Sequence, residues 1–179
     1  MRFGMINGRA VVVHDDRALD IERASEGRFS SRMVDALEHW DALLDWARRV
    51  TFDLADTFVP GDLGAVVDAP RQVFAVGLNY REHAEEANTT TPDEPLVFTK
   101  FPTSIVGPTA TVELPSENVD WEAELVVVIG QYTYRVDAEK AWDHVAGLTA
   151  GQDLSERTVQ LAGPVPQFSM GKSFPGFGP

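Results

Sequence analysis

Hydrophobic and polar positions change period along the chain, and these changes predict its elements. Between residues 31 and 50 the apolar side chains recur every three or four positions, which predicts one long helix with Ser31 as its N-cap. Its apolar stripe consists of Met33, Leu37, Trp40, Leu43, Leu44, Ala47 and Val50. Near the start of the chain, two apolar runs flank Asn7 and Gly8, the residue pair typical of a two-residue β-hairpin turn.

Two further elements follow from local signals. Residues 72–77 form a short apolar run, which predicts a strand. Residues 137–146 are predicted to form a second helix, with Asp137 as its N-cap and Gly147 just past its end.

The longest predicted strand covers residues 119–130, where β-branched residues are dense. Glu122 and Glu124 share one face of such a strand, because side chains two positions apart point the same way. The opposite face is wholly apolar and consists of Trp121, Ala123, Leu125, Val127 and Ile129. The pattern therefore predicts a buried strand with an acidic pair at its rim.

This acidic pair suggests a cation site. Two carboxylates about 7 Å apart along a strand repel each other unless a positive charge lies between them. Asp153 would complete a three-oxygen ligand set, and Lys172 would place an ammonium beside it. Oxygen ligands favour Mg²⁺, Mn²⁺ or Ca²⁺ over Zn²⁺, which prefers His and Cys. The alternative is that Glu122 and Glu124 belong to an ordinary solvated sheet edge.

Composition narrows the class of protein. The 179 residues are 44% hydrophobic, enough for one domain with a sizeable core and a small appended domain. The formal net charge of −13 argues against nucleic acid and against anionic membranes as partners. The chain has no cysteine, so disulfides and thiolate chemistry are excluded. No signal-peptide pattern and no long apolar run occur, and we expect a cytoplasmic enzyme.

Five segments occur in an order and approximate spacing that resemble one known family. They are residues 76–84, 95–100, 121–125, 152–157 and 171–174. In these segments the chain resembles the fumarylacetoacetate hydrolase superfamily, in particular its branch of acylpyruvases and 2-hydroxyhepta-2,4-diene-1,7-dioate isomerases. The resemblance covers residues from about 71 to 179.

The resemblance implies a metal site with a neighbouring cation. Glu122, Glu124 and Asp153 match the family's metal ligands, and the implied ion is Mg²⁺, or else Mn²⁺ or Ca²⁺. Lys172 matches the family's lysine beside the metal, where it would stabilise negative charge developing on substrate oxygens.

The resemblance also implies a base and a substrate pocket. His83 matches the catalytic base and Glu86 the acid that orients it, and at a spacing of three the two share a helix face. The positions that match substrate-binding residues are Lys100, Arg157, Gln160 and Tyr80. The polar stretch 87–95 directly after His83 is read either as a lid over the substrate or as an ordinary loop.

The implied fold class is α+β. We expect a mixed β-roll or β-sandwich of the fumarylacetoacetate hydrolase C-terminal type over residues 71–179, preceded by a small N-terminal α+β domain over residues 1–70. Family members continue past the position matching Pro179, so we expect a chain that ends before this fold is complete. The resemblance also implies a homodimer.

The implied function is cleavage of a carbon–carbon bond. The substrate would be a small anionic acylpyruvate or 1,3-dicarbonyl acid, hydrolysed through a metal-stabilised enolate, with His83 activating water. The alternatives are a decarboxylase or isomerase of a 2-oxo or dienoic diacid. Two non-catalytic alternatives also stand: a fragment or partner subunit of a longer relative, and a simple metal-binding protein.

Overall fold

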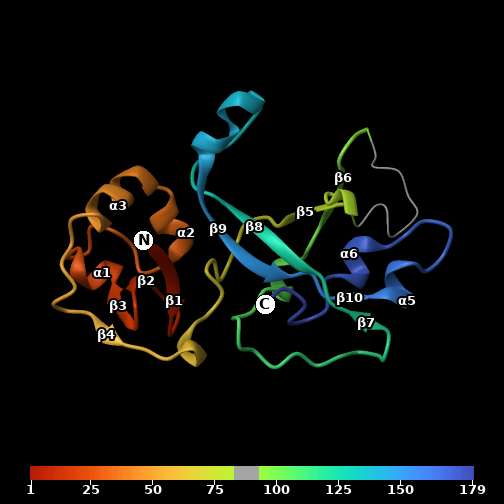
Figure 1. Ribbon diagram of the computed structural model, residues 1–179, viewed down its shortest axis with the longest axis horizontal. Helices are drawn as coiled ribbons and strands as arrows, with labels where there is room; N and C mark the ends of the chain where they lie inside the picture. Colours follow the sequence, from red (N-terminus) through yellow and green to blue (C-terminus); the bar gives the residue numbers. More distant parts are fainter. Residues whose placement is uncertain (83–92) are drawn as a thin grey trace.

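The computed structural model describes residues 1–82 and 93–179, which are almost the whole chain (Figure 1). The first strands are β1 (Arg2–Ile6), β2 (Arg9–His14), β3 (Arg17–Asp20), β4 (Asp56–Thr57) and β5 (Phe74–Gly77). The later strands are β6 (Leu96–Thr99), β7 (Val119–Asp120), β8 (Ala123–Ile129), β9 (Val145–Gln152) and β10 (Ser155–Glu156). The α-helices are α1 (Ile21–Ala24), α2 (Met33–Leu37), α3 (Trp40–Ala47), α5 (Arg157–Gln160) and α6 (Phe168–Gly171). The 3-10 helices are η1 (Pro60–Asp62), η2 (Pro102–Ser104) and η3 (Ala138–His144).

The N-terminal part is an antiparallel four-stranded sheet in the order β1-β2-β3-β4. The predicted hairpin forms, with Ile6 paired to Arg9 across the turn. Asn7 and Gly8 both have positive φ, 50° and 72°, as a turn of this type requires. Helices α1–α3 lie with this sheet at one end of the molecule, and the remaining elements lie beside them (Figure 1).

The single helix predicted over residues 31–50 is wrong, because two helices cover this range. Helix α2 ends at Leu37 and α3 begins at Trp40, with His39 between them in a non-helical conformation (φ −121°, ψ 35°). The predicted N-cap is also wrong, because Arg32 holds that position and Ser30 accepts a hydrogen bond from its N–H. The break lets both helices pack their apolar sides onto the same sheet.

These apolar sides form the main core. It consists of Met5, Ala10, Val12, Ile21, Phe29, Met33, Ala36, Leu43 and Ala47, all buried. Phe3 of β1 meets Trp40 of α3 edge to face, with ring centroids 4.9 Å apart. The helical stripe is therefore packing against the sheet.

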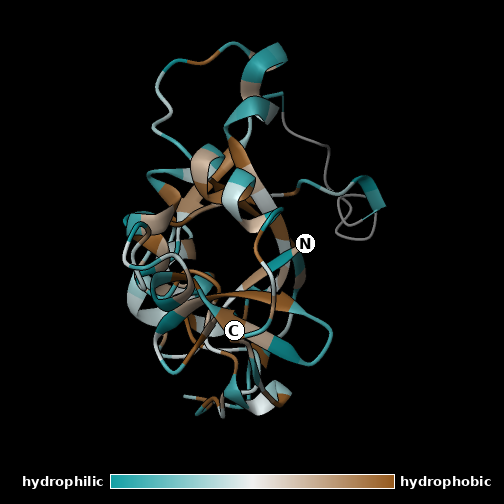
Figure 2. Ribbon diagram, turned by 90° about the vertical axis from the view of Figure 1, so that its left-hand side faces the viewer, coloured by the Kyte–Doolittle hydropathy of each residue, from teal (hydrophilic) through white to brown (hydrophobic). Residues whose placement is uncertain are grey.

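Beyond residue 70, the described residues form three antiparallel strand pairs, β5-β6, β7-β10 and β8-β9. The β8–β9 pair is the longest, with its register running from Ala123 opposite Gln152 to Ile129 opposite Val145. Hydrophobic stretches follow the strands in Figure 2. The C-terminal tail lies between the end of β9 and the segment that follows η2, because the N–H of Gln152 donates to the carbonyl of Pro179 and the N–H of Val106 to that of Gly178.

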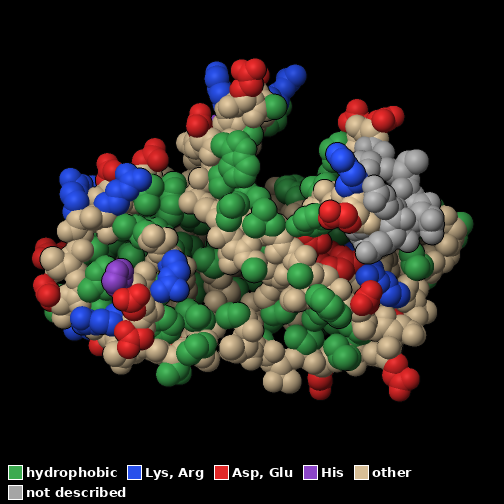
Figure 3. Space-filling model, viewed as in Figure 1, with side chains coloured by type: hydrophobic (Ala, Val, Ile, Leu, Met, Phe, Trp, Pro, Cys, Tyr) green, Lys and Arg blue, Asp and Glu red, His purple; other side chains and the backbone are tan. Residues whose placement is uncertain are grey.

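The long strand predicted over residues 119–130 is interrupted, and its apolar face is not buried. Val119–Asp120 pairs with β10, and the chain pairs with β9 from Ala123 onward. The two residues between these strands belong to neither ladder. Trp121 is 69% exposed and Leu125 58% exposed, because no described element packs over that face of β8. Figure 3 shows hydrophobic side chains over the middle of the molecular face, whereas charged ones lie at its left-hand end, at its top and toward its right-hand side.

The second helix, predicted over residues 137–146, forms as a different type of helix. Residues 138–144 form a 3-10 helix, and Asp137 holds its N-cap position as predicted, although its side chain makes no capping hydrogen bond. Gly147 lies within β9 rather than past a helix end. Strand β9 and helix α6 carry no clear sequence signal and were not predicted. No helix among the described residues is long and apolar enough to cross a membrane.

Candidate active site

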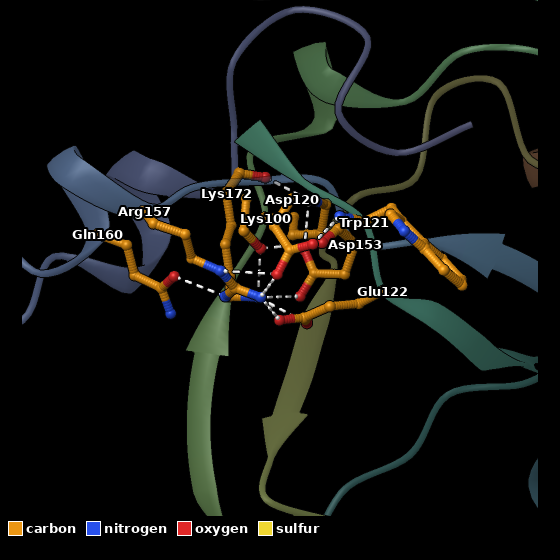
Figure 4. Close-up of polar contacts among 9 residues, drawn as sticks. Lys100, Asp120, Trp121, Glu122, Asp153, Arg157, Gln160 and Lys172 are labelled. Carbon is orange, nitrogen blue, oxygen red and sulfur yellow. Dashed lines mark hydrogen bonds and ion pairs between the residues drawn. The ribbon is translucent and has the colours of Figure 1, made fainter. Parts of the chain in front are cut away.

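The pairing of β8 with β9 brings two of the predicted carboxylates together. Glu122 directly precedes β8 and Asp153 directly follows β9, and the N–H of Asp153 donates to the carbonyl of Glu122 (2.9 Å). Their side chains point into one polar cluster (Figure 4). Glu124 lies in β8 two residues after Glu122, pairs with Gly151 of β9 and is half-buried.

Lys172 enters the same cluster because two short helices pack very closely. A Cβ on Gly171 would lie 2.6 Å from the backbone nitrogen of Gln160 and 2.7 Å from its Cα, so α6 can approach α5 this closely only with glycine there. Lys172 is the next residue, at the C-terminal end of α6. The glycine before the lysine therefore sets where the ammonium lies.

The ammonium of Lys172 bridges both carboxylates. Its Nζ is 2.8 Å from Oε2 of Glu122, 2.9 Å from Oδ2 of Asp153 and 2.7 Å from Oγ of Ser155. The side chain is 3% exposed. A buried ammonium with three oxygen partners is fully hydrogen-bonded, which is the condition for burying a charge.

A second buried lysine meets Asp153 from the other side. Lys100 follows β6, and its Nζ lies 2.6 Å from Oδ1 of Asp153. It also donates to the backbone carbonyl of Lys172. Both oxygens of Asp153 therefore contact an ammonium.

Arg157, the first residue of α5, closes the cluster toward solvent. Its Nη2 lies 2.7 Å from Oε1 of Glu122 and 2.8 Å from Oδ2 of Asp120, and its Nη1 lies 2.8 Å from Oε1 of Gln160. The six charged side chains Lys100, Asp120, Glu122, Asp153, Arg157 and Lys172 carry three positive and three negative charges (Figure 4).

The surroundings shift the proton affinities of these groups. Burial lowers the pKa of Lys100, and Asp153 only partly restores it. Burial raises the pKa of Glu122, but the hydrogen bonds and charges of Lys172 and Arg157 outweigh it and hold the pKa below its usual value. The hydrogen bond from Arg157 likewise lowers the pKa of Asp120. The carboxylates Glu122 and Asp120 are thus held in their charged form.

The donor set suits a hard cation in part. Glu122 and Asp153 offer carboxylate oxygens close enough for one positive group to contact both, as Lys172 does, and oxygen ligands are those that Mg²⁺, Mn²⁺ and Ca²⁺ prefer. Across residues 1–82 and 93–179, however, no three His, Cys, Asp or Glu side chains gather in a metal-holding arrangement. The pair fits a divalent ion, and the third ligand, Glu124, stays a prediction.

The structure gathers six of the ten predicted site residues into this cluster. They are Lys100, Glu122, Asp153, Arg157, Gln160 and Lys172. Tyr80 is 43% exposed, and no hydrogen bond joins it to the cluster residues described above. His83, Glu86 and most of the stretch 87–95 lie outside the described residues.

Sequence reasoning missed two members of the cluster. Asp120 lies two residues before Glu122, so the same alternation that paired Glu122 with Glu124 could have pointed to it. Ser155 lies two residues after Asp153 and donates to its backbone carbonyl (2.9 Å), which holds the hydroxyl beside Lys172. A lone serine at the start of the two-residue strand β10 gives no comparable sequence signal.

Comparison with known proteins identifies the family of the chain that carries this cluster. The family model described as fumarylacetoacetate (FAA) hydrolase C-terminal matches residues 72–179, more than half of the chain. The chain belongs to the fumarylacetoacetate hydrolase family. The predicted family and fold class are therefore confirmed.

Individual relatives agree with this assignment. The chain is 38% identical to oxaloacetate tautomerase FAHD2A, mitochondrial, of Bos taurus over 160 residues, which are 87% of this chain and 51% of the relative. A crystal structure of a candidate HpcE protein from Mycobacterium smegmatis is 49% identical, with a TM-score of 0.93 over all of this chain and 64% of the other. Fumarylacetoacetate hydrolase from Exiguobacterium antarcticum is 28% identical, with a TM-score of 0.77, over 99% of this chain and 62% of the other. The chain spans about half the length of the curated relative it matches.

Several expectations remain predictions after these comparisons. They are the domain boundary at residue 70, the cytoplasmic location, the homodimer and the roles of individual site residues. The activity is also open, because the named relatives include both a tautomerase and a hydrolase.

Proposed function

We propose that this chain carries the active site of an enzyme that moves a proton at the carbon next to the carbonyl of a small 2-oxo diacid. The observation that supports this most is the buried cluster of Glu122 and Asp153 with Lys100 and Lys172. A relative with 38% identity over most of the chain is named an oxaloacetate tautomerase. The proposed reaction is keto–enol interconversion of oxaloacetate or a closely similar acid.

The cluster offers what such a reaction needs. Removing a proton next to a carbonyl places negative charge on the carbonyl oxygen, and fixed positive groups in a water-poor site stabilise that charge. Lys172 and Lys100 are nearly enclosed by protein, so their ammonium groups are weakly screened by water. Glu122 and Asp153 would hold the divalent cation. When bound, this ion would polarise the 2-oxo group and strengthen its attraction for the developing charge.

The transfer of the proton is assigned to His83, with Glu86 as its orienting partner, because their motif resembles that of the family's base and acid. A positioned base of this kind typically contributes about 10²–10⁴-fold to a rate. Asp153 would have a second role, because it is the carboxylate that keeps both lysines in place.

The test is the ultraviolet loss of enol-oxaloacetate with Mg²⁺, beside Asp153→Asn and the control Asp137→Asn. Asp137 is exposed and its carboxylate pairs with Lys140 at 3.9 Å, so its variant makes the same charge change outside the cluster. We expect a rate above that of Mg²⁺ alone, lost in Asp153→Asn and kept in Asp137→Asn. A folded protein that gives no rate above Mg²⁺ alone contradicts the proposal.

Hydrolysis of a carbon–carbon bond is the second candidate. A fumarylacetoacetate hydrolase shares this fold at 28% identity. In that reaction water would attack a distal carbonyl, the carbon–carbon bond would break to release an enolate of the same kind, and the enolate would then take up a proton at carbon. Acetylpyruvate distinguishes the two candidates, because its hydrolysis yields acetate and pyruvate whereas tautomerisation leaves the carbon skeleton intact and yields no pyruvate. Appearance of pyruvate would favour the hydrolase, and decarboxylation would appear instead as release of CO₂.

A further inference from the structure

Asp120 is fixed at both of its carboxylate oxygens. Its Oδ1 accepts the N–H of Trp121 (2.9 Å), and its Oδ2 accepts from Nη2 and Nε of Arg157 (2.8 and 3.3 Å). Its backbone pairs with Ser155, whose hydroxyl contacts Lys172. A carboxylate held at this many points has one orientation rather than the several of a free surface side chain.

Arg157 has almost all of its hydrogen-bonding capacity engaged by protein. A guanidinium has five N–H donors. Two of them point to Asp120, one to Glu122 and one to Gln160, which leaves a single N–H on Nη1. Arg157 already directs Nε and Nη2 to Asp120, so it cannot present to a substrate carboxylate the two parallel N–H groups with which arginine usually binds one.

The bridge through Nη2 links the rim of the cluster to its interior. Exposure of the side chains falls from 54% at Asp120 to 32% at Arg157, 22% at Glu122 and 8% at Asp153. Asp120 holds the guanidinium so that the second Nη2 N–H meets Oε1 of Glu122. Oε2 of Glu122 is then left facing Lys172 and the interior.

We propose that Asp120 is a positioning residue that acts through Arg157 to fix the carboxylate of Glu122 toward the cluster. The inference rests on the proposed function, in which Glu122 helps to hold the divalent cation. Groups that orient a ligand typically change metal affinity or activity by 10–100-fold when they are replaced. Asp120 itself touches neither substrate nor cation in this assignment.

The first test is the affinity of the chain for Mn²⁺, measured by electron paramagnetic resonance. Asn at position 120 keeps an oxygen for the N–H of Trp121 but loses the charge that holds Arg157. We expect Asp120→Asn to raise the Mn²⁺ dissociation constant by 10-fold or more. Asp120→Glu should recover most of the affinity, and Asp137→Asn should change it by less than about twofold. Equal affinity in Asp120→Asn and the unsubstituted chain, with unchanged circular dichroism, overturns the inference.

A second measurement separates this inference from the proposed function. If the unsubstituted chain binds no Mn²⁺, the proposed cation site fails, but the link from Asp120 to Glu122 can still be measured by urea unfolding. Asp120→Asn, Glu122→Gln and the double variant form a cycle, and residues that share a partner are coupled. We expect the unfolding equilibrium constants to depart from additivity by about twofold or more. The departure should vanish when the cycle is repeated with Arg157→Met, and an additive first cycle contradicts the positioning role.

Discussion

Replacing Lys172 with Met is the sharpest test of the cluster as a structural unit. Methionine fills much of the same space but removes the ammonium from its contacts with Glu122, Asp153 and Ser155. Breaking a buried ion pair typically costs about 3–5 kcal/mol, because a buried charge is left without its partner.

The structure places the expected cost at the lower end of that range. Glu122 keeps Arg157 and Asp153 keeps Lys100, so each carboxylate still has one cation. We therefore expect Lys172→Met to lower the free energy of unfolding by about 3 kcal/mol. At a urea m-value of about 2 kcal/mol/M this moves the midpoint by about 1.5 M.

The assay is urea unfolding at pH 7 in the presence of a chelator, because a bound ion would add its own stabilisation. The matched control is Lys140→Met, which removes an ammonium that is 70% exposed and 3.9 Å from Asp137. Lys140→Met should change the free energy of unfolding by no more than about 0.5 kcal/mol. A loss below about 1 kcal/mol for Lys172→Met, at an unchanged m-value, would refute the bridging role of Lys172.

Three further predictions concern the same fold. Gly171→Ala should destabilise the chain by about 1–3 kcal/mol in urea, because its Cβ would overlap the backbone of Gln160, whereas Gly147→Ala, with open space around it, should be nearly neutral. Gly8→Ala should cost about 1–2 kcal/mol in the same assay, because φ at this turn is positive. The pKa of Glu122 is lowered in the folded chain, so its stabilisation is full above the ordinary value of 4.5 and is lost as pH falls through the folded value. Glu122→Gln should flatten this acid limb of the unfolding free energy, and an unchanged limb would contradict the assignment.

Local signals in the sequence predicted local structure where adjacent residues determine it. The Asn7-Gly8 hairpin was found because two adjacent residues determine its turn. The continuous helix over residues 31–50 failed at His39, because packing both halves on one sheet outweighs the periodicity of the stripe. Short-range reasoning cannot weigh a contact with another element.

The candidate site depended on residues far apart in the chain. Lys100 and Asp153 are 53 positions apart, and their proximity follows from strand pairing that spacing alone does not reveal. The resemblance supplied this long-range information for six side chains of the cluster. The alternation of residues along β8 could not reveal that Leu125 would be exposed, because alternation marks an apolar face without showing which element covers that face.

Arg157 shows a different limit of sequence reasoning. Its position matched a substrate-binding residue, and the structure places it beside the predicted ligand Glu122. Two of its four hydrogen bonds to protein acceptors go to Asp120, a residue to which the sequence assigned no role. Which donors of a side chain are already engaged is visible only once its neighbours are placed.

The central claim is that this cluster promotes proton transfer next to the carbonyl of a 2-oxo acid. The most direct measurement is deuterium incorporation at that carbon of oxaloacetate, followed by nuclear magnetic resonance in D₂O with Mg²⁺. We predict exchange faster than with Mg²⁺ alone, reduced at least 10-fold in Asp153→Asn and unchanged in Asp137→Asn. Exchange by the folded chain no faster than with Mg²⁺ alone, or equal exchange by the Asp153→Asn protein, would contradict the claim.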